Sequence, residues 1–101
     1  MAGRNKPLGF SRNRHRDQAV IALDSAVSHM QKAEQVQCRN KAEHLIRAAE
    51  SLGEARADMA AYSAFSTMKE RKPLQARFGN VHDRLRKSLE HFKIRCRPVK
   101  R

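Results

Sequence analysis

The stretch that decides the fold is PLQARFGNVHDRLRKSLEHFKIRC, residues 73–96. Apolar side chains recur in it every three or four residues, the spacing that places them on one face of an α-helix. An apolar face of this kind has to be covered by other elements, so the sequence predicts a packed helical protein. The face comprises Leu74, Phe78, Val81, Leu85, Leu89, Phe92 and Cys96.

Prolines mark the expected ends of this helix. Pro73 disfavours the α conformation of Lys72, which predicts a break between helices at this point. Pro98 is expected to end the helix. Gly79–Asn80 can interrupt it, with Asn80 capping a restart.

A first helix is expected to start near Arg16–Asp17, where the acid complements the positive end of the helix dipole. It fades around Gln35–Arg39, where the apolar pattern is lost. Val20 lies at the edge of its apolar face. That face comprises Ala19, Leu23, Ala26, Val27, Met30 and Ala33.

A second helix follows, and Asn40 with Glu43 resembles a capping box at its start. The same apolar phase continues beyond Gly53, and glycine costs only about 1 kcal/mol inside a helix. One long helix over about 40–70 is therefore favoured over two shorter ones. Its expected apolar face comprises Ala42, Leu45, Ile46, Ala49 and Leu52, and it continues with Ala55, Met59, Tyr62 and Phe65 or Ser66.

Together these patterns predict an all-α protein, a small antiparallel bundle of three helices, or four if the chain breaks at Gly53. Pro7, Gly9 and Asn13 oppose helix formation near the start of the chain. Residues 1–15 are expected to be a flexible basic arm, residues 16–97 the bundle and residues 98–101 a basic tail.

The chain has 101 residues and a formal net charge of +12. Residues 1–16 contribute +5, residues 17–68 contribute −2 and residues 69–101 contribute +9. Solubility alone does not require this segregation, which favours a dedicated function in binding anions.

Cations of the last helix fall within a sector of about 80° beside its apolar face. Arginine binds phosphate oxygens bidentately, so these residues and the basic arm are expected to contact nucleic-acid phosphates. Aromatic residues do not alternate with the cations, which favours contact with the backbone of duplex DNA or structured RNA. The predicted binding residues are Arg12, Arg14, Arg16, Arg77, Arg84, Lys87, Arg95 and Arg97.

Catalytic motifs are weak, and no enzymatic activity or cofactor is expected. Arg39 and His44 resemble the Arg-x4-His element of HEPN-type ribonucleases. That resemblance implies that the arginine steadies a phosphate and the histidine moves protons, and it covers six residues. The ribonuclease remains a remote alternative.

Cys38 and Cys96 are too few and too far apart to indicate a disulfide framework. Cys96 is expected to act as a small apolar side chain in a reducing cytosol or nucleus. Neither cysteine has the spacing of a zinc site with His44, His82 or His91. Residues 1–16 have no apolar signal region, and no stretch is long enough to span a membrane. The chain is therefore expected to be intracellular.

The leading hypothesis is a small basic nucleic-acid-binding protein without enzymatic activity. The alternative is a protein-interaction module, an inhibitor, adaptor or assembly subunit that docks on an acidic partner. The alanine-rich face of residues 48–64 supports this alternative and also suits a homodimer or larger assembly, because small side chains let helices approach closely.

Overall fold

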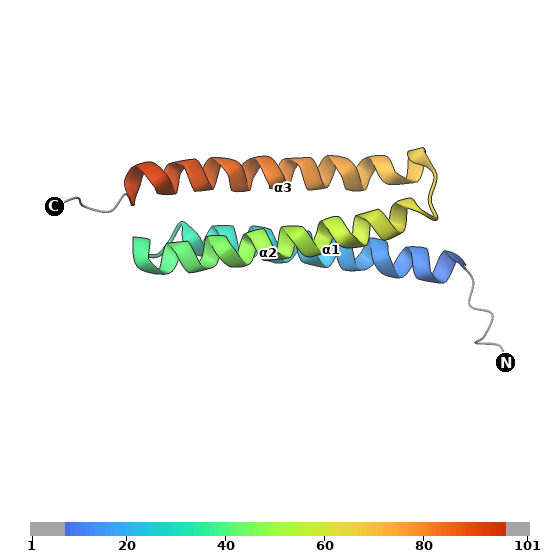
Figure 1. Cartoon of the computed structure of the whole chain (residues 1–101), viewed down its shortest axis with the longest axis horizontal. Helices are drawn as coiled ribbons and strands as arrows, with labels where there is room; N and C mark the ends of the chain where they lie inside the picture. The colour runs from blue at the N-terminus through green and yellow to red at the C-terminus, as the bar shows by residue number, and fades with distance from the viewer. Residues whose placement is uncertain (1–7, 97–101) are drawn as a thin grey trace.

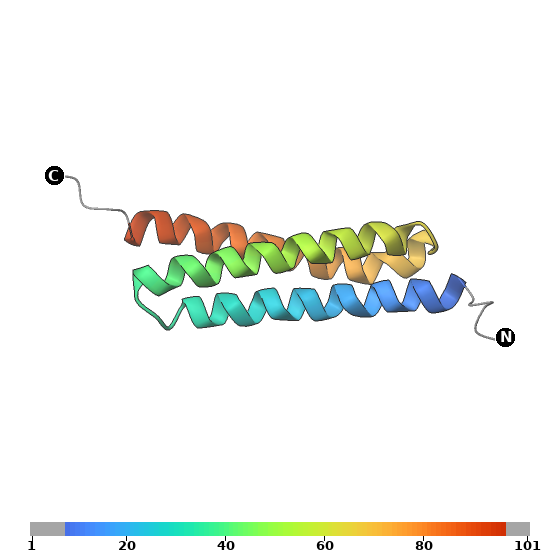
Figure 2. The ribbon, with the colours of Figure 1, turned by 60° about the horizontal axis from the view of Figure 1, so that its bottom comes forward.

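Three long α-helices lie side by side lengthwise (Figure 1). The computed structural model describes residues 8–96, with side chains from residue 13 onward, and these residues contain no strand. Helix α1 spans Leu8–Ala33, α2 spans Cys38–Ser63 and α3 spans Met68–Arg95. Because the connecting segments are short, neighbouring helices run antiparallel, and α1 and α3 run parallel to each other (Figure 2). The predicted all-α bundle of three helices is confirmed.

Two glycines lie inside unbroken helices. Helix α2 continues through Gly53, as the sequence favoured, and α3 continues through Gly79. The predicted interruption at Gly79–Asn80 is therefore wrong. A Cβ atom added at either glycine would meet nothing within 4 Å. Neither glycine is therefore required for close packing. Both helices tolerate a glycine because packing against the other helices stabilises the turns on either side of it.

Helix α1 begins earlier than the sequence predicted. Leu8 is its first residue, so Gly9 and Asn13 lie in the helix and not in an irregular arm. His15 contacts Asp58 of α2 at 3.0 Å from Nδ1 to Oδ1. A tertiary contact of this kind stabilises a helix that contains residues of poor helix propensity. The cost of such a residue is small, about 1 kcal/mol for a glycine relative to an alanine.

The remaining parts of the predicted arm and tail, residues 1–7 and 98–101, lie outside the described residues. So do the predicted stop at Pro98 and the side chains of Arg12 and Arg97. Their placement on one surface with the helices stays a prediction.

The capping box predicted at Asn40 is wrong. Helix α2 begins at Cys38, and Gln37 occupies the N-cap position without a side-chain hydrogen bond. The corner between α1 and α2 is closed instead by Lys41, whose Nζ donates to the carbonyl of Ala33 at 2.6 Å. A contact between two helices thus replaces the expected local cap.

A capping box does exist, at the start of α3. Thr67 Oγ1 accepts from the backbone N–H of Glu70, and Glu70 Oε1 accepts from the backbone N–H of Thr67. The helix therefore starts before Pro73, and the predicted break at that proline is wrong. Pro73 removes only the hydrogen bond to the carbonyl of Lys69, an exposed residue whose carbonyl water can reach.

The core lies mainly between α1 and α2. Leu23 and Met30 are its largest fully buried side chains. Alanines on both helices allow close approach, because Ala26 and Ala48 have no exposed surface. The buried residues are Ala19, Ala22, Leu23, Ala26, Met30, Ala33, Leu45, Ala48, Leu52, Ala55, Tyr62, Leu74, Val81 and Leu85.

The predicted face of α2 is partly wrong. Leu45 and Leu52 are buried, but Ile46 is 59% exposed and Ala49 is also exposed. Ala55 and Tyr62, which the sequence placed on the same face, are buried as predicted. Alanine occurs on both faces of this helix, so its sequence did not define the phase.

Helix α3 buries less than its periodicity suggested. Leu74, Val81 and Leu85 are buried, whereas Phe78 and Phe92 are only partly buried. Leu89, predicted for the core, is 39% exposed. The carboxyl-terminal turns of α3 therefore depend on another kind of attachment.

That attachment is a disulfide. Cys38 and Cys96 are bonded, with their Cα atoms 5.5 Å apart and a sequence separation of 58. The prediction of unpaired thiols, with Cys96 as a small apolar side chain, is wrong. Disulfides persist in oxidising surroundings, so this bond removes the reason for expecting a reducing compartment.

Candidate nucleic-acid interface

Two of the cations predicted along one side of α3, Arg77 and Arg84, pair with carboxylates of α1. Arg77 Nη2 contacts Asp24 Oδ1 at 2.6 Å, and Arg84 Nη2 contacts Glu34 Oε2 at 3.7 Å. Both pairs join the parallel helices α1 and α3. The groups are about half exposed, so each pair adds at most about 1 kcal/mol to stability. The protein's own carboxylates thus neutralise part of the predicted phosphate-binding surface.

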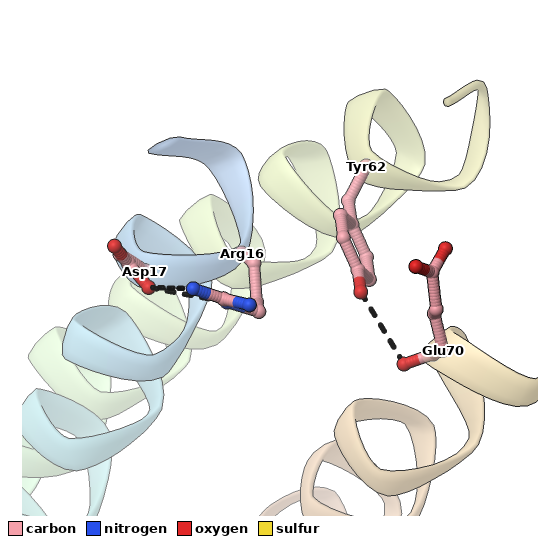
Figure 3. A network of polar contacts seen from close by, with 4 residues as sticks. All are labelled: Arg16, Asp17, Tyr62 and Glu70. Carbon is pink, nitrogen blue, oxygen red and sulfur yellow. Dashed lines mark hydrogen bonds and ion pairs between the residues drawn. The ribbon is translucent and has the colours of Figure 1, made fainter. Parts of the chain in front are cut away.

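The arginines near the start of α1 divide into paired and unpaired groups. Arg16 donates from Nε to Asp17 Oδ1 at 3.2 Å, and its Nη2 lies 3.2 Å from the same oxygen (Figure 3). Arg14 is exposed and has no carboxylate partner within the described residues. Arg14 is therefore the more available of the two cations.

The predicted cations do not gather on a single surface. Arg14 and Arg16 lie near the start of α1, whereas Arg95 lies at the end of α3. These two points are at opposite ends of the bundle (Figure 1). A helix of 28 residues is about 42 Å long, so one small ligand cannot contact both groups.

The structure brings two of the predicted cations, Lys87 and Arg95, together with three others where α1 ends, α2 begins and α3 ends (Figure 1). The disulfide places the start of α2 directly beside the end of α3. We call this region the basic end, and define it by cations that are exposed and have no carboxylate partner among the residues described. They are Lys32, Arg39, Lys87, Lys93 and Arg95.

A small hollow lies in the basic end between the three helices. Its volume is about 100 Å³, and His91 and Arg95 of α3 line it together with Lys41 of α2. Met30 and Phe92 form part of its apolar floor. It has room for a few water molecules, so larger ligands would contact the surface around it.

Two histidines stack at the α1–α2 interface, and one of them, His29, has a shifted pKa. The rings of His29 and His44 stack with their centroids 5.8 Å apart, and each Nδ1 atom is buried without a hydrogen-bond partner. Burial lowers the pKa of His29, and the nearby Lys32, His44 and Arg47 lower it further. His29 is therefore neutral at pH 7.

The ribonuclease-like pair makes no contact among the residues described. Arg39 is exposed, whereas His44 is half-buried against His29. Five positions along an α-helix separate their directions by about 140°. The ribonuclease alternative stays a prediction.

Other site chemistry is sparse in the part of the chain that the structure describes. It contains no group of three histidine, cysteine or acidic side chains arranged to hold a metal ion. Both cysteines are used in the disulfide. Within residues 8–96, no helix combines the length and apolarity required to cross a bilayer.

Sequence reasoning found two members of the basic end, Lys87 and Arg95, and missed the other three. Lys32, Arg39 and Lys93 belong to three different helices, whose ends meet only in the folded bundle. The only available signal was the presence of two cysteines, at the start of one helix and the end of another. Comparison with protein families, with curated proteins and with solved structures finds no match for this chain.

Proposed function

We propose that this chain is a small nucleic-acid-binding protein without enzymatic activity, which contacts phosphate backbones through its basic end. The observation that carries the proposal is the group of exposed, carboxylate-free cations contributed by three helices. The sequence adds Arg97, Lys100 and Arg101 directly after Cys96. These three cations follow the described part of α3 in the sequence.

The charge balance supports a polyanionic ligand. Two carboxylates that could offset the positive charge of the basic end already have partners. Glu34 pairs with Arg84, and Glu90 pairs with Arg86. Guanidinium and ammonium groups release condensed counterions when they bind phosphates, which supplies affinity without sequence readout.

The aromatic residues favour a duplex over an unpaired strand. Phe78 and Phe92 pack against the core, and Tyr62 is buried. Phe65 is 40% exposed, but it lies at the corner between α2 and α3, away from the basic end. Proteins that bind single strands stack bases on exposed aromatic rings, and the basic end offers none among the residues described.

The test is the salt dependence of binding to a labelled duplex of mixed sequence, followed by fluorescence anisotropy. Each phosphate contact adds a slope of about −0.9 to the plot of log affinity against log salt concentration. Five contacts therefore predict a slope of about −4 to −5. Affinity that stays constant between 50 and 200 mM salt (a range in which such contacts weaken strongly) would contradict the proposal.

A second candidate, docking on an acidic protein, is favoured by one observation. Ile94 is 71% exposed and lies between Lys93 and Arg95. An acidic protein surface with an apolar patch would complement this arrangement, whereas a phosphate backbone offers no apolar surface for the isoleucine to contact. Replacement of Ile94 by serine should leave duplex affinity unchanged if nucleic acid is the ligand, and should weaken a protein complex.

A further inference from the structure

The last turns of α3 bury little surface against the other two helices. Leu85 is the last residue of α3 with a buried side chain among the residues described. Leu89 and Ile94 are 39% and 71% exposed, and Phe92 packs against the core only in part. Apolar burial therefore holds residues 86–95 more weakly than the preceding turns.

Polar contacts do not replace the missing burial. Arg84 is the last residue of α3 that pairs with another helix, at 3.7 Å from Glu34. Arg86 pairs twice, both times within α3. In the described segment 85–96, no hydrogen bond or ion pair reaches α1 or α2. Phe92 and the disulfide are therefore the main attachments of this end of α3.

Like charges act against these attachments. Three cations of the basic end, Lys87, Lys93 and Arg95, lie on the last turns of α3. The other two, Lys32 and Arg39, belong to α1 and α2. All five are exposed and have no carboxylate partner among the residues described, so they repel one another while no anion is bound. The disulfide keeps the end of α3 in place against this repulsion.

The disulfide lies where a thiol reagent can reach it. Cys38 is exposed and Cys96 is half-buried. Cys38 is also the first residue of α2, where the positive end of the helix dipole favours a departing thiolate. A small dithiol in solution can therefore attack at Cys96 and displace Cys38.

The exchange balances as follows. A thiolate of the dithiol bonds to Cys96 Sγ as the S–S bond breaks, and the electron pair goes to Cys38 Sγ, which takes up a proton. The second thiol of the reagent then attacks the mixed disulfide and releases Cys96 as a thiol. Two electrons and two protons pass to the protein, and the reagent becomes a disulfide.

We propose that the Cys38–Cys96 disulfide is a redox switch for polyanion binding, in which reduction by a dithiol releases the last turns of α3 and disperses the basic end. The oxidised protein holds cations of three helices in fixed positions, whereas the reduced protein has to order the end of α3 when it binds. The number of cations is unchanged, and only their arrangement differs. This inference rests on the proposed function, because it concerns the regulation of the same surface.

The first experiment measures the affinity of the full chain for a labelled duplex, oxidised and then reduced with dithiothreitol. The reduced protein should bind about tenfold more weakly, because binding then has to order several residues. Reoxidation should restore the affinity. Equal affinities, in a complex that salt still weakens, would overturn the switch and leave the proposed function intact. An oxidised protein that does not bind duplex would overturn both.

Hydrogen exchange of the backbone amides shows which part of the molecule opens. Reduction should speed exchange at residues 86–95, whereas the amides of Leu23 and Leu52, which lie in the core, should stay protected. Faster exchange over the whole chain would mean that reduction unfolds the protein. Unchanged exchange at residues 86–95 would mean that the end of α3 stays in place. Either result would overturn the proposal.

Variants separate the covalent link from general stability. Cys38→Ser combined with Cys96→Ser should bind duplex as the reduced wild type does, and should ignore dithiothreitol. Val81→Ala is the matched control, because it removes buried methyl groups from α3 and leaves the disulfide intact. It should keep the wild-type affinity when oxidised. A loss of affinity in oxidised Val81→Ala equal to that of the double serine variant would contradict the switch.

A last measurement uses the reciprocity of linked equilibria. If reduction weakens duplex binding tenfold, saturating duplex must oppose reduction by the same factor, which lowers the midpoint potential of the disulfide by about 30 mV. Equilibration against buffers of reduced and oxidised dithiothreitol, with and without duplex, measures this shift. A midpoint that ignores the duplex would overturn the proposal.

Discussion

Cys38, the first residue of α2, is bonded to Cys96, the residue that caps α3. The bond closes one end of a bundle whose third helix buries only three side chains fully. It also joins the start of α2, which carries Arg39, to the end of α3, which carries Arg95, and so helps to form the basic end. Stability and the proposed binding surface therefore depend on the same covalent link.

Reduction of this disulfide should destabilise the protein. The bond spans 58 residues, and the loss of loop-closure restraint predicts a decrease in the free energy of unfolding of about 2–4 kcal/mol. Urea denaturation with and without dithiothreitol measures the change. A protein with both Cys38→Ser and Cys96→Ser should match the reduced wild type and ignore the reductant. An unfolding midpoint that does not respond to reduction would contradict the role given to the bond.

Gly53→Ala should stabilise the protein. The position is exposed inside α2, and an added Cβ atom meets nothing within 4 Å. The higher helix propensity of alanine predicts a gain of about 0.5–1 kcal/mol in the free energy of unfolding. Ala49→Gly, at an exposed position one turn earlier, is the matched reverse change and should cost a similar amount. A destabilised Gly53→Ala variant would show that the face has a tight partner.

Leu23→Ala tests the position of the core. Leu23 has no exposed surface, so the loss of its side chain should cost about 2–5 kcal/mol. Ile46→Ala removes a side chain of the same volume that is 59% exposed, and should cost less than about 1 kcal/mol. Similar losses for the two variants, measured by urea denaturation, would indicate that the apolar face predicted for α2 was right.

Mild acid should weaken the α1–α2 interface through His29. Burial and the neighbouring cations lower the pKa of His29 in the folded protein. The unfolded chain then binds a proton more readily, so this contribution to stability is present above pH 6.5 and is lost as the pH falls through the lowered pKa. His29→Gln should flatten the plot of melting temperature against pH between 7.5 and 5, whereas His91→Gln, at an exposed position, should not. A steeper plot for His29→Gln would reverse the assignment.

The helices and part of the core follow from local chemistry. Residues 74–92 carry a periodic face that needs no knowledge of its partners, and the apolar face around Leu23 and Met30 is equally regular. The phase of α2 was less predictable because alanine occupies both of its faces, as Ala48 and Ala49 illustrate. The alanine-rich face of residues 48–64 was expected to suit dimerisation. Two of its residues, Ala48 and Ala55, are instead buried in the core of the bundle.

The electrostatic surface could not be derived from charge totals. Asp24 and Glu34 belong to a segment whose net charge is slightly negative, and nothing in the sequence assigns them to Arg77 and Arg84. The pairing depends on the parallel register of α1 and α3, which is a tertiary property. The disulfide depends on the same register, since it requires two helix ends to meet.

The most direct test of the account compares the two ends of the molecule at constant net charge. One variant carries Lys87→Gln, Lys93→Gln and Arg95→Gln in the basic end, and the other carries Arg14→Gln, Lys69→Gln and Lys72→Gln at the opposite end. Both lose three charges from exposed side chains that have no carboxylate partner among the residues described. The basic-end variant should bind duplex with a salt slope reduced by about three, and the other should bind nearly as the wild type does. Equal losses of affinity would show that total charge, and not the basic end, determines binding.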